Sequence, residues 1–216
     1  MKINKPEMLE ELDYVEDMTL LLEQVRELEI DIENKHIKDA YLTEEAMDGI
    51  DFNGILFENC KFVDCKFEKA SFVDAVFQTC DLSNSNFANG YFKRCEFLSC
   101  KWMGSNLYNS HLQHISIKDC NLRYMNLDKT SMSFIHILKT DLSNANISEC
   151  KLKSWELKEV LLTNSAFFKT SLRGVDFTES EITGIILSNN YAELQGAIVN
   201  VLQAAELAKF LGVVVK

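Results

Sequence analysis

Residues 52–77 read FNGILFENCKFVDCKFEKASFVDAVF, with phenylalanine at every fifth position. A large apolar residue keeps this register without interruption from Phe52 to Leu187. A period of five matches neither the turn of an α-helix, about 3.6 residues, nor the alternation of a simple strand. A fixed period held over this length predicts a repeat architecture, in which one structural unit is stacked many times.

A second register accompanies the first, because the residue two positions before each large one is uncharged and mostly small, as at Ala70 and Ser85. Two inward side chains in every five residues predict a chain that turns a corner after each unit. Glycines such as Gly54 and Gly104 lie two residues after the large one, where glycine tolerates unusual backbone angles. All seven cysteines occupy the small inward position: Cys60, Cys65, Cys80, Cys95, Cys100, Cys120 and Cys150.

The repeat unit resembles that of the pentapeptide-repeat proteins, written A(D/N)LXX. Residues 80–82, 140–142 and 145–147 read CDL, TDL and ANI and fit this unit closely. The resemblance implies an all-β solenoid, a right-handed quadrilateral β-helix with four pentapeptides in each coil. The register then makes seven coils, and an eighth upstream is indicated by Ile32, Ile37, Leu42 and Met47. With about 4.8 Å between stacked strands, the rod is about 35 to 40 Å long.

The chain divides into three expected segments. Residues 1–49 form an acidic N-terminal cap, 50–189 the pentapeptide β-helix, and 190–216 a C-terminal helix and strand for capping and dimerisation. Within the cap we expect an amphipathic helix from residue 1 to about 26, with Pro6 in its first turn and an apolar stripe that includes Met8 and Leu22. This helix covers the open end of the rod; the alternative is a dedicated binding helix.

The C-terminal segment changes its pattern after Asn189. Asn200 and Gln203 form a variant of the helix capping box, and Gly212 lies where a C-terminal cap belongs. Val213, Val214 and Val215 then predict a short strand. A helix and an exposed strand at a rod end favour an end-to-end homodimer; in the alternative, both fold back on their own last coil.

Charge is unevenly distributed along the 216 residues. The formal net charge is −11, and residues 1–50 contribute 15 acidic and 5 basic groups to it. Sorting the outward positions by coil places one set of acids on one face, the acidic stripe: Glu58, Glu96, Asp119, Glu156, Glu159, Asp176 and Glu179. Another face, the basic face, carries Lys93, Arg94, Lys151, Lys153 and Arg173 beside Asp51 and Asp74. An acidic stripe can attract basic partners, although a solvated face is the common explanation of a charge run.

A narrower resemblance concerns the end of the chain. Residues 170–177, the exit at 189–191 and the ending 204–215 look like the C-terminal region of the Qnr-type pentapeptide proteins of Gram-positive bacteria. This resemblance implies a dimeric rod that imitates duplex DNA, binds a type II topoisomerase (DNA gyrase or topoisomerase IV) and protects it from quinolones. The acidic stripe would face the enzyme. The implied dimer contacts are Val201, Leu207, Phe210, Leu211, Val213, Val214 and Val215.

Other classes of function find little support in the residues. We find no G-x-S-x-G, no phosphate-binding glycine loop and no third ligand beside His111 and His114, so we expect no enzyme, cofactor or metal. A pI of about 4.9 disfavours direct nucleic-acid binding. Buried, unpaired cysteines and the lack of a secretion signal or membrane span favour a cytoplasmic location. The alternative to topoisomerase binding is a rigid interaction scaffold with another protein partner.

Overall fold

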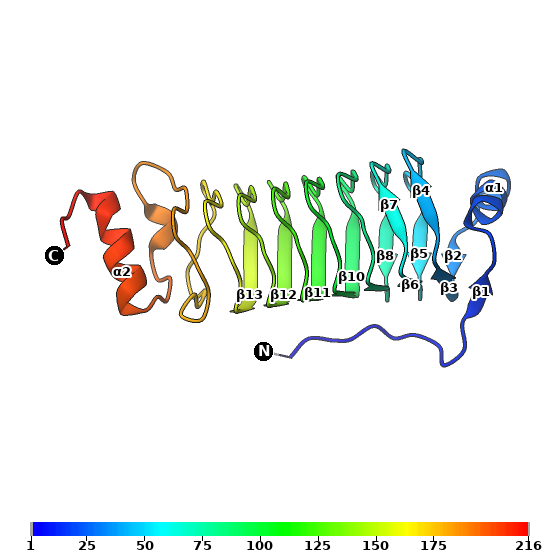
Figure 1. The fold of residues 1–216 in the computed structure, drawn as a ribbon, viewed down its shortest axis with the longest axis horizontal. Coiled ribbons are helices and arrows are strands. Elements are labelled where there is room, and N and C mark those ends of the chain that lie inside the picture. The colour runs from blue at the N-terminus through cyan, green and yellow to red at the C-terminus, as the bar shows by residue number, and fades with distance from the viewer. Residues whose placement is uncertain (1, 216) are drawn as a thin grey trace.

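The computed structural model describes residues 2–215 and forms one straight rod of stacked coils (Figure 1). Its helical segments are α1 (Met18–Leu28), η1 (Ala192–Leu194), α2 (Val201–Ala208) and η2 (Lys209–Leu211). The early strands are β1 (Asp13–Val15), β2 (Ile32–Glu33), β3 (Lys35–Lys38), β4 (Tyr41–Thr43), β5 (Asp51–Asn53), β6 (Leu56–Glu58), β7 (Lys61–Val63), β8 (Ser71–Val73) and β9 (Val76–Gln78). The later strands are longer: β10 (Tyr91–Leu98), β11 (His111–Lys118), β12 (Ser131–Leu138) and β13 (Lys151–Lys158).

Each coil takes 20 residues, as the repeat predicts. Parallel pairs join Phe52 to Phe72 and Phe92 to Leu112, and the same step continues through β12 and β13. The upstream coil is present too, because Ile32 pairs with Phe52 and Leu42 with Phe62. The predicted solenoid is therefore confirmed.

The corners of the coils have the left-handed backbone that the glycine positions predicted. At Gly54 φ is 67°, and an added Cβ would lie 2.7 Å from Oδ1 of Asn34. Equivalent corners without glycine are occupied by residues such as Asn84 and Asn144, with φ of 58° and 61°. Asparagine tolerates this conformation better than most residues, so the corner can repeat without a glycine in every unit.

The core is a ladder of inward side chains that changes character along the rod. In the N-terminal half the phenylalanine rings stack, with centroids 4.8 Å apart for Phe52 and Phe72 and 4.9 Å apart for Phe72 and Phe92. Trp102 ends this stacked aromatic part, and leucine, isoleucine and methionine predominate in the following coils, where Trp155, Phe167 and Phe177 are the buried aromatic residues of the described chain. Nearly all the large residues of the five-residue register are buried, so their inward assignment is confirmed.

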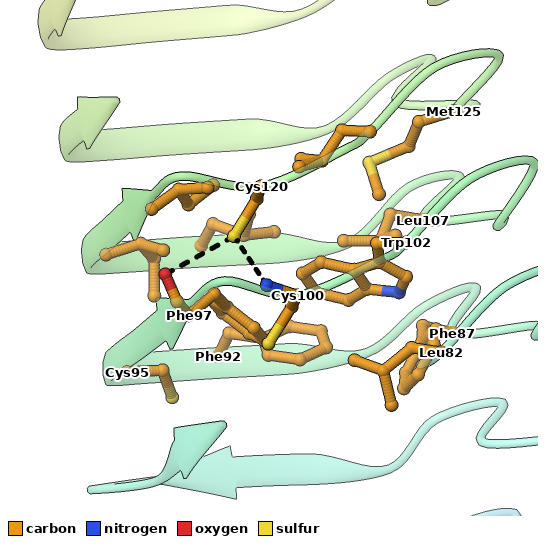
Figure 2. Packing of buried hydrophobic residues seen from close by; sticks show 14 of the residues in the cluster. Leu82, Phe87, Phe92, Cys95, Phe97, Cys100, Trp102, Leu107, Cys120 and Met125 are labelled. Atoms are coloured by element: carbon orange, nitrogen blue, oxygen red, sulfur yellow. Dashed lines mark hydrogen bonds between the residues drawn. The ribbon is translucent and has the colours of Figure 1, made fainter. Parts of the chain in front are cut away.

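The seven cysteines are free and buried. Each thiol reaches a main-chain carbonyl of the preceding coil; Cys120 donates to the Phe97 oxygen at 3.5 Å and accepts from the Cys100 N–H at 3.2 Å (Figure 2). Burial raises the pKa of Cys95 and of Cys150 to about 12, so both thiols are protonated at neutral pH. No cluster of three or more metal-binding side chains occurs among residues 2–215.

The N-terminal segment differs from the predicted long helix. Helix α1 begins only at Met18, because Asp17 caps it by accepting from the Thr19 N–H at 2.8 Å. Before it, β1 pairs in parallel with β3 and adds a strand to the first coil. Residues 2–12, which we call the arm, form neither helix nor strand and extend along the side of the rod (Figure 1). Three α1 residues, Met18, Leu22 and Val25, join the apolar core.

The C-terminal segment matches its prediction in the helix and departs from it in the strand. Asn200 and Gln203 form the capping box, and Gly212 ends η2 with φ of 74°. Before α2 the chain makes one further partial coil, because Asp176 pairs with Ile198. The expected strand at Val213–Val215 is wrong: these residues join no strand ladder in the described chain and remain exposed, and the Val213 N–H instead donates to the Ala208 oxygen at 3.3 Å, at the end of the helix.

Candidate interaction surfaces

The acidic stripe lies on one side of the β10–β13 ladder. The register places Glu96, Ser116, His136 and Glu156 in one line, so two positions of this line carry no carboxylate. The predicted acids therefore fall into an N-terminal member, Glu58, a central pair, Glu96 and Asp119, and a C-terminal group. We call this last group the acidic cluster; it contains Glu156, Glu159, Asp176 and Glu179, all exposed.

Basic side chains offset part of the stripe. Glu58 is hydrogen-bonded by Lys38 at 2.7 Å and by His36 at 2.9 Å. Both hydrogen bonds lower the pKa of Glu58, and the bond from Lys38 has the larger effect. Further along, Lys158 lies 3.6 Å from Glu179, and the other pairs are Lys118 with Asp119 at 3.9 Å and Lys139 with Glu159 at 4.0 Å. Exposed pairs of this kind contribute about 0 to 1 kcal/mol each, so their main effect is on the local potential.

Two carboxylates at the C-terminal end of the rod are held in the ionised form. Asp176 accepts from the Thr178 hydroxyl at 2.7 Å and from its N–H at 2.9 Å, and both bonds lower the pKa of Asp176. Glu181, which the sequence reasoning missed, makes the same pair of bonds with Thr183, and its pKa is lowered for the same reason. An acid followed two positions later by threonine is the signal that would have found it.

The C-terminal end of the rod exposes an apolar surface. Helix α2 is anchored through Gln203, whose amide donates to the Phe177 oxygen at 2.8 Å and to the Ser180 oxygen at 2.6 Å. This anchor leaves one side of the helix open to solvent. The apolar residues on this open side and in the chain after Gly212 form a surface that we call the apolar patch. It contains Val201, Leu202, Leu211, Val213, Val214 and Val215, all at least 49 % exposed.

The predicted dimer residues divide into two groups. Five of the seven belong to the apolar patch, whereas Leu207 and Phe210 are half-buried and pack on their own chain. Phe210 stacks on Tyr191 with centroids 5.4 Å apart. Leu202 was missed, although it is 80 % exposed, because the capping box alone does not decide which helix face turns outward.

The basic face is partly occupied by the arm. The Glu7 N–H donates to Oδ1 of Asp74 at 2.9 Å, and the Asn4 N–H donates to Nδ1 of His114 at 3.3 Å. Asp74 is ion-paired with Arg94 and is buried. No feature of the arm's sequence predicted this contact, because its apolar spacing indicates a helix and its hydrogen bonds to the rod come from the main chain.

The family model described as a pentapeptide repeat region matches residues 50–126 and 91–167, together more than half of the chain. The chain belongs to the pentapeptide-repeat family. No curated protein matches it significantly in sequence. Neither α1 nor α2, the α-helices of the described part, has the length and apolar character needed to cross a membrane.

Three solved pentapeptide-repeat structures illustrate the similarity. Full-length QnrB1, a plasmid-mediated fluoroquinolone resistance protein, is 20 % identical over 85 % of this chain and 94 % of its own, with a TM-score of 0.48. HetL from the cyanobacterium Nostoc sp. strain PCC 7120, involved in regulating heterocyst differentiation, is 15 % identical over 86 % and 98 %, with a TM-score of 0.38. Rfr23 from the cyanobacterium Cyanothece 51142 is 12 % identical over 85 % and 100 %, with a TM-score of 0.32. At these identities the roles of those proteins do not carry over to this chain.

Proposed function

We propose that this pentapeptide-repeat protein is a non-catalytic DNA mimic that binds a type II topoisomerase, DNA gyrase or topoisomerase IV, in the cytoplasm and protects it from quinolones. The observation that carries the proposal is the grouping of Glu156, Glu159, Asp176 and Glu179 on the last coils, all exposed. A rod that presents carboxylates along one side offers a DNA-binding cleft the same sign of charge as the phosphates of DNA. Such a cleft responds to the regular anionic charge of duplex DNA.

Dimerisation is the second part of the proposal. The apolar patch lies at the same end of the rod as the acidic cluster, and an exposed apolar patch is typical of a protein interface. A two-fold contact through this patch would join two rods end to end and bring both acidic clusters next to the dimer centre. The negative charge facing a partner would then double without any new acidic residue.

The dimer contact can be tested by placing a charge in it. Leu202→Asp with Val214→Asp should convert the dimer to a monomer in sedimentation equilibrium, because both side chains are 80 % exposed in the single chain. Leu28→Asp is the matched control, since Leu28 is 65 % exposed at the opposite end of the rod. A monomeric wild type, or a double variant that remains dimeric, would contradict the proposed contact.

Enzyme binding can be tested by charge reversal. Glu156→Lys with Glu159→Lys changes the charge by four per chain, and we expect at least a tenfold loss of gyrase affinity with an unchanged melting temperature. Glu44→Lys with Asp51→Lys makes the same change on two other faces, where both residues are exposed, and should leave affinity nearly unchanged. Equal affinity of the two double variants would show that the acidic cluster does not face the enzyme.

A scaffold for a different protein is the second candidate. It is favoured by the lysines beside Asp119, Glu159 and Glu179, because they weaken the negative potential that a DNA mimic needs. A partner protein that recognises the shape of the rod and forms local ion pairs does not need a net negative potential, so the lysines would not weaken its binding. Absence of gyrase binding, together with a different partner whose affinity changes little with salt, would support the scaffold.

A further inference from the structure

The arm makes contacts that any extended peptide could make. Its two hydrogen bonds to the rod use backbone N–H groups, from Asn4 and Glu7, rather than its side chains. Four of the apolar side chains in residues 2–12 are half-buried, Ile3, Pro6, Met8 and Leu12, whereas Leu9 is exposed. Main-chain bonds combined with shallow apolar contacts are how proteins recognise extended segments with some tolerance of sequence.

Beneath the arm, the coils hold two hydrogen-bond acceptors in fixed positions, which together we call the receptor. Oδ1 of Asp74 accepts both the Glu7 N–H at 2.9 Å and Nε of Arg94 at 2.5 Å, so one carboxylate joins the arm to a buried ion pair. The His114 ring, which accepts the Asn4 N–H at 3.3 Å, is held by stacking on Phe134 with centroids 4.6 Å apart. Both acceptors belong to the coils and are therefore in place whether or not the arm is bound.

The arm itself is loosely attached. None of its residues belongs to a strand ladder or to the apolar core, which begins at Met18. Leu9 is 60 % exposed and its neighbours Glu10 and Glu11 are exposed as well, so the connection to β1 lies in solvent. A segment held by so few contacts opens at a much lower free energy than the coils do.

The same face continues beyond the tip of the arm as an open basic groove of about 580 Å³. It follows His114 along the ladder, since His111 pairs with Ser131 in the next coil. None of its described lining residues is acidic, and neither Lys151 nor Arg173 forms an ion pair with a described residue. The polar residues that line it are Ser131, Ser133, Lys151, Lys153, Lys169, Ser171 and Arg173.

We propose that the basic face is a docking surface for an extended acidic peptide of a partner protein, and that the arm is its intramolecular competitor. The peptide would replace the arm at Asp74 and His114 and extend acidic residues into the basic groove beyond. The hydrogen bonds of residues 2–12 to the rod end at His114, and none of these residues pairs with Lys151, Lys153 or Arg173, so an acidic peptide that continues into the groove gains contacts that the described arm does not make. This surface lies on a different face from the acidic stripe, and the inference is independent of topoisomerase binding.

The test uses the full chain and two fluorescent peptides. The first has the sequence of residues 1–16; the second carries four glutamates ahead of the same sequence, so that they reach the groove. In the wild type the attached arm competes with the added peptide at an effective concentration of about 1 mM or more. Met8→Asp loosens the arm without altering the receptor, because Met8 lies outside the core.

We expect both peptides to bind the Met8→Asp protein at least tenfold more tightly than the wild type, by fluorescence anisotropy. The glutamate peptide should bind more tightly than the first, and Lys153→Glu with Arg173→Glu, added to Met8→Asp, should remove this difference. Faster hydrogen exchange of residues 2–12 verifies that the arm is released. An unchanged melting temperature verifies that the coils are intact. With the arm released, absence of binding, or equal affinity for wild type and variant, would overturn the proposal.

Discussion

Replacing Phe72 by alanine tests the stacked core most severely. Phe72 is 0 % exposed, and its ring lies 4.8 Å from that of Phe52 and 4.9 Å from that of Phe92. Four more rings surround it at 5.6 to 6.5 Å: Phe57, Phe67, Phe77 and Phe87. A buried Phe→Ala change costs about 3 to 5 kcal/mol, and aromatic pairs add about 0.5 to 1.5 kcal/mol each beyond the buried area. We therefore expect a loss near the upper end, about 4 to 5 kcal/mol.

The assay is urea unfolding followed by circular dichroism, with Tyr91→Ala as the control. Tyr91 also loses an aromatic ring but is 38 % exposed on the outside of β10, so we expect a cost below about 1 kcal/mol. The two variants thus compare similar side chains on opposite sides of one chain wall. A cost below about 1 kcal/mol for Phe72→Ala, or equal costs for the two variants, would refute the inward ladder of stacked rings.

Three further outcomes are expected. Gln203→Ala should lower the free energy of unfolding by about 1 to 3 kcal/mol, because the Phe177 and Ser180 carbonyls lose their donor; unchanged hydrogen exchange in α2 would contradict this anchor. Burial, with Arg94 and Lys93 nearby, lowers the pKa of His114 from 6.5, so the ring is neutral at pH 7 and accepts the arm's N–H. Protection of the arm should therefore be complete above pH 6.5 and be lost as the pH falls through the lowered value, and His114→Ala should abolish this pH dependence. Gyrase affinity should fall as salt rises from about 0.05 to 0.3 M, because ions screen exposed carboxylates; a flat salt profile would favour the scaffold.

The coils were predictable because their pattern is local and repeated. Each large inward residue from Phe52 to Leu187 predicts the same repeat geometry, so one wrongly assigned residue would not change the predicted fold. The capping box at Asn200 is equally local, since its partner Gln203 lies three residues away. Residues that act through neighbours in sequence are therefore the ones that sequence reasoning places correctly.

The ends of the chain depended on contacts that the sequence does not encode locally. Pro6 and Met8 fit a helix by spacing, yet the arm lies on coils more than 60 residues away, as the Glu7 to Asp74 bond shows. The valines at 213–215 have strand propensity, but a strand needs a partner edge, and within residues 2–215 these valines pair with none. The lysines that pair with Glu159 and Glu179 lie one coil earlier at the same or a neighbouring position of the 20-residue period, so the sorting that gathers the acids also places these lysines on the same face.

The most direct measurement of the proposed function is gyrase supercoiling in the presence of the purified protein, with and without ciprofloxacin. The protein is titrated over a range that spans its affinity for the enzyme, and the Glu156→Lys with Glu159→Lys variant is run beside it. The proposal predicts recovery of drug-inhibited supercoiling at concentrations that leave the drug-free reaction intact, and no recovery with the variant. No effect on either reaction, or equal recovery by wild type and variant, would contradict a DNA mimic that acts through its acidic cluster.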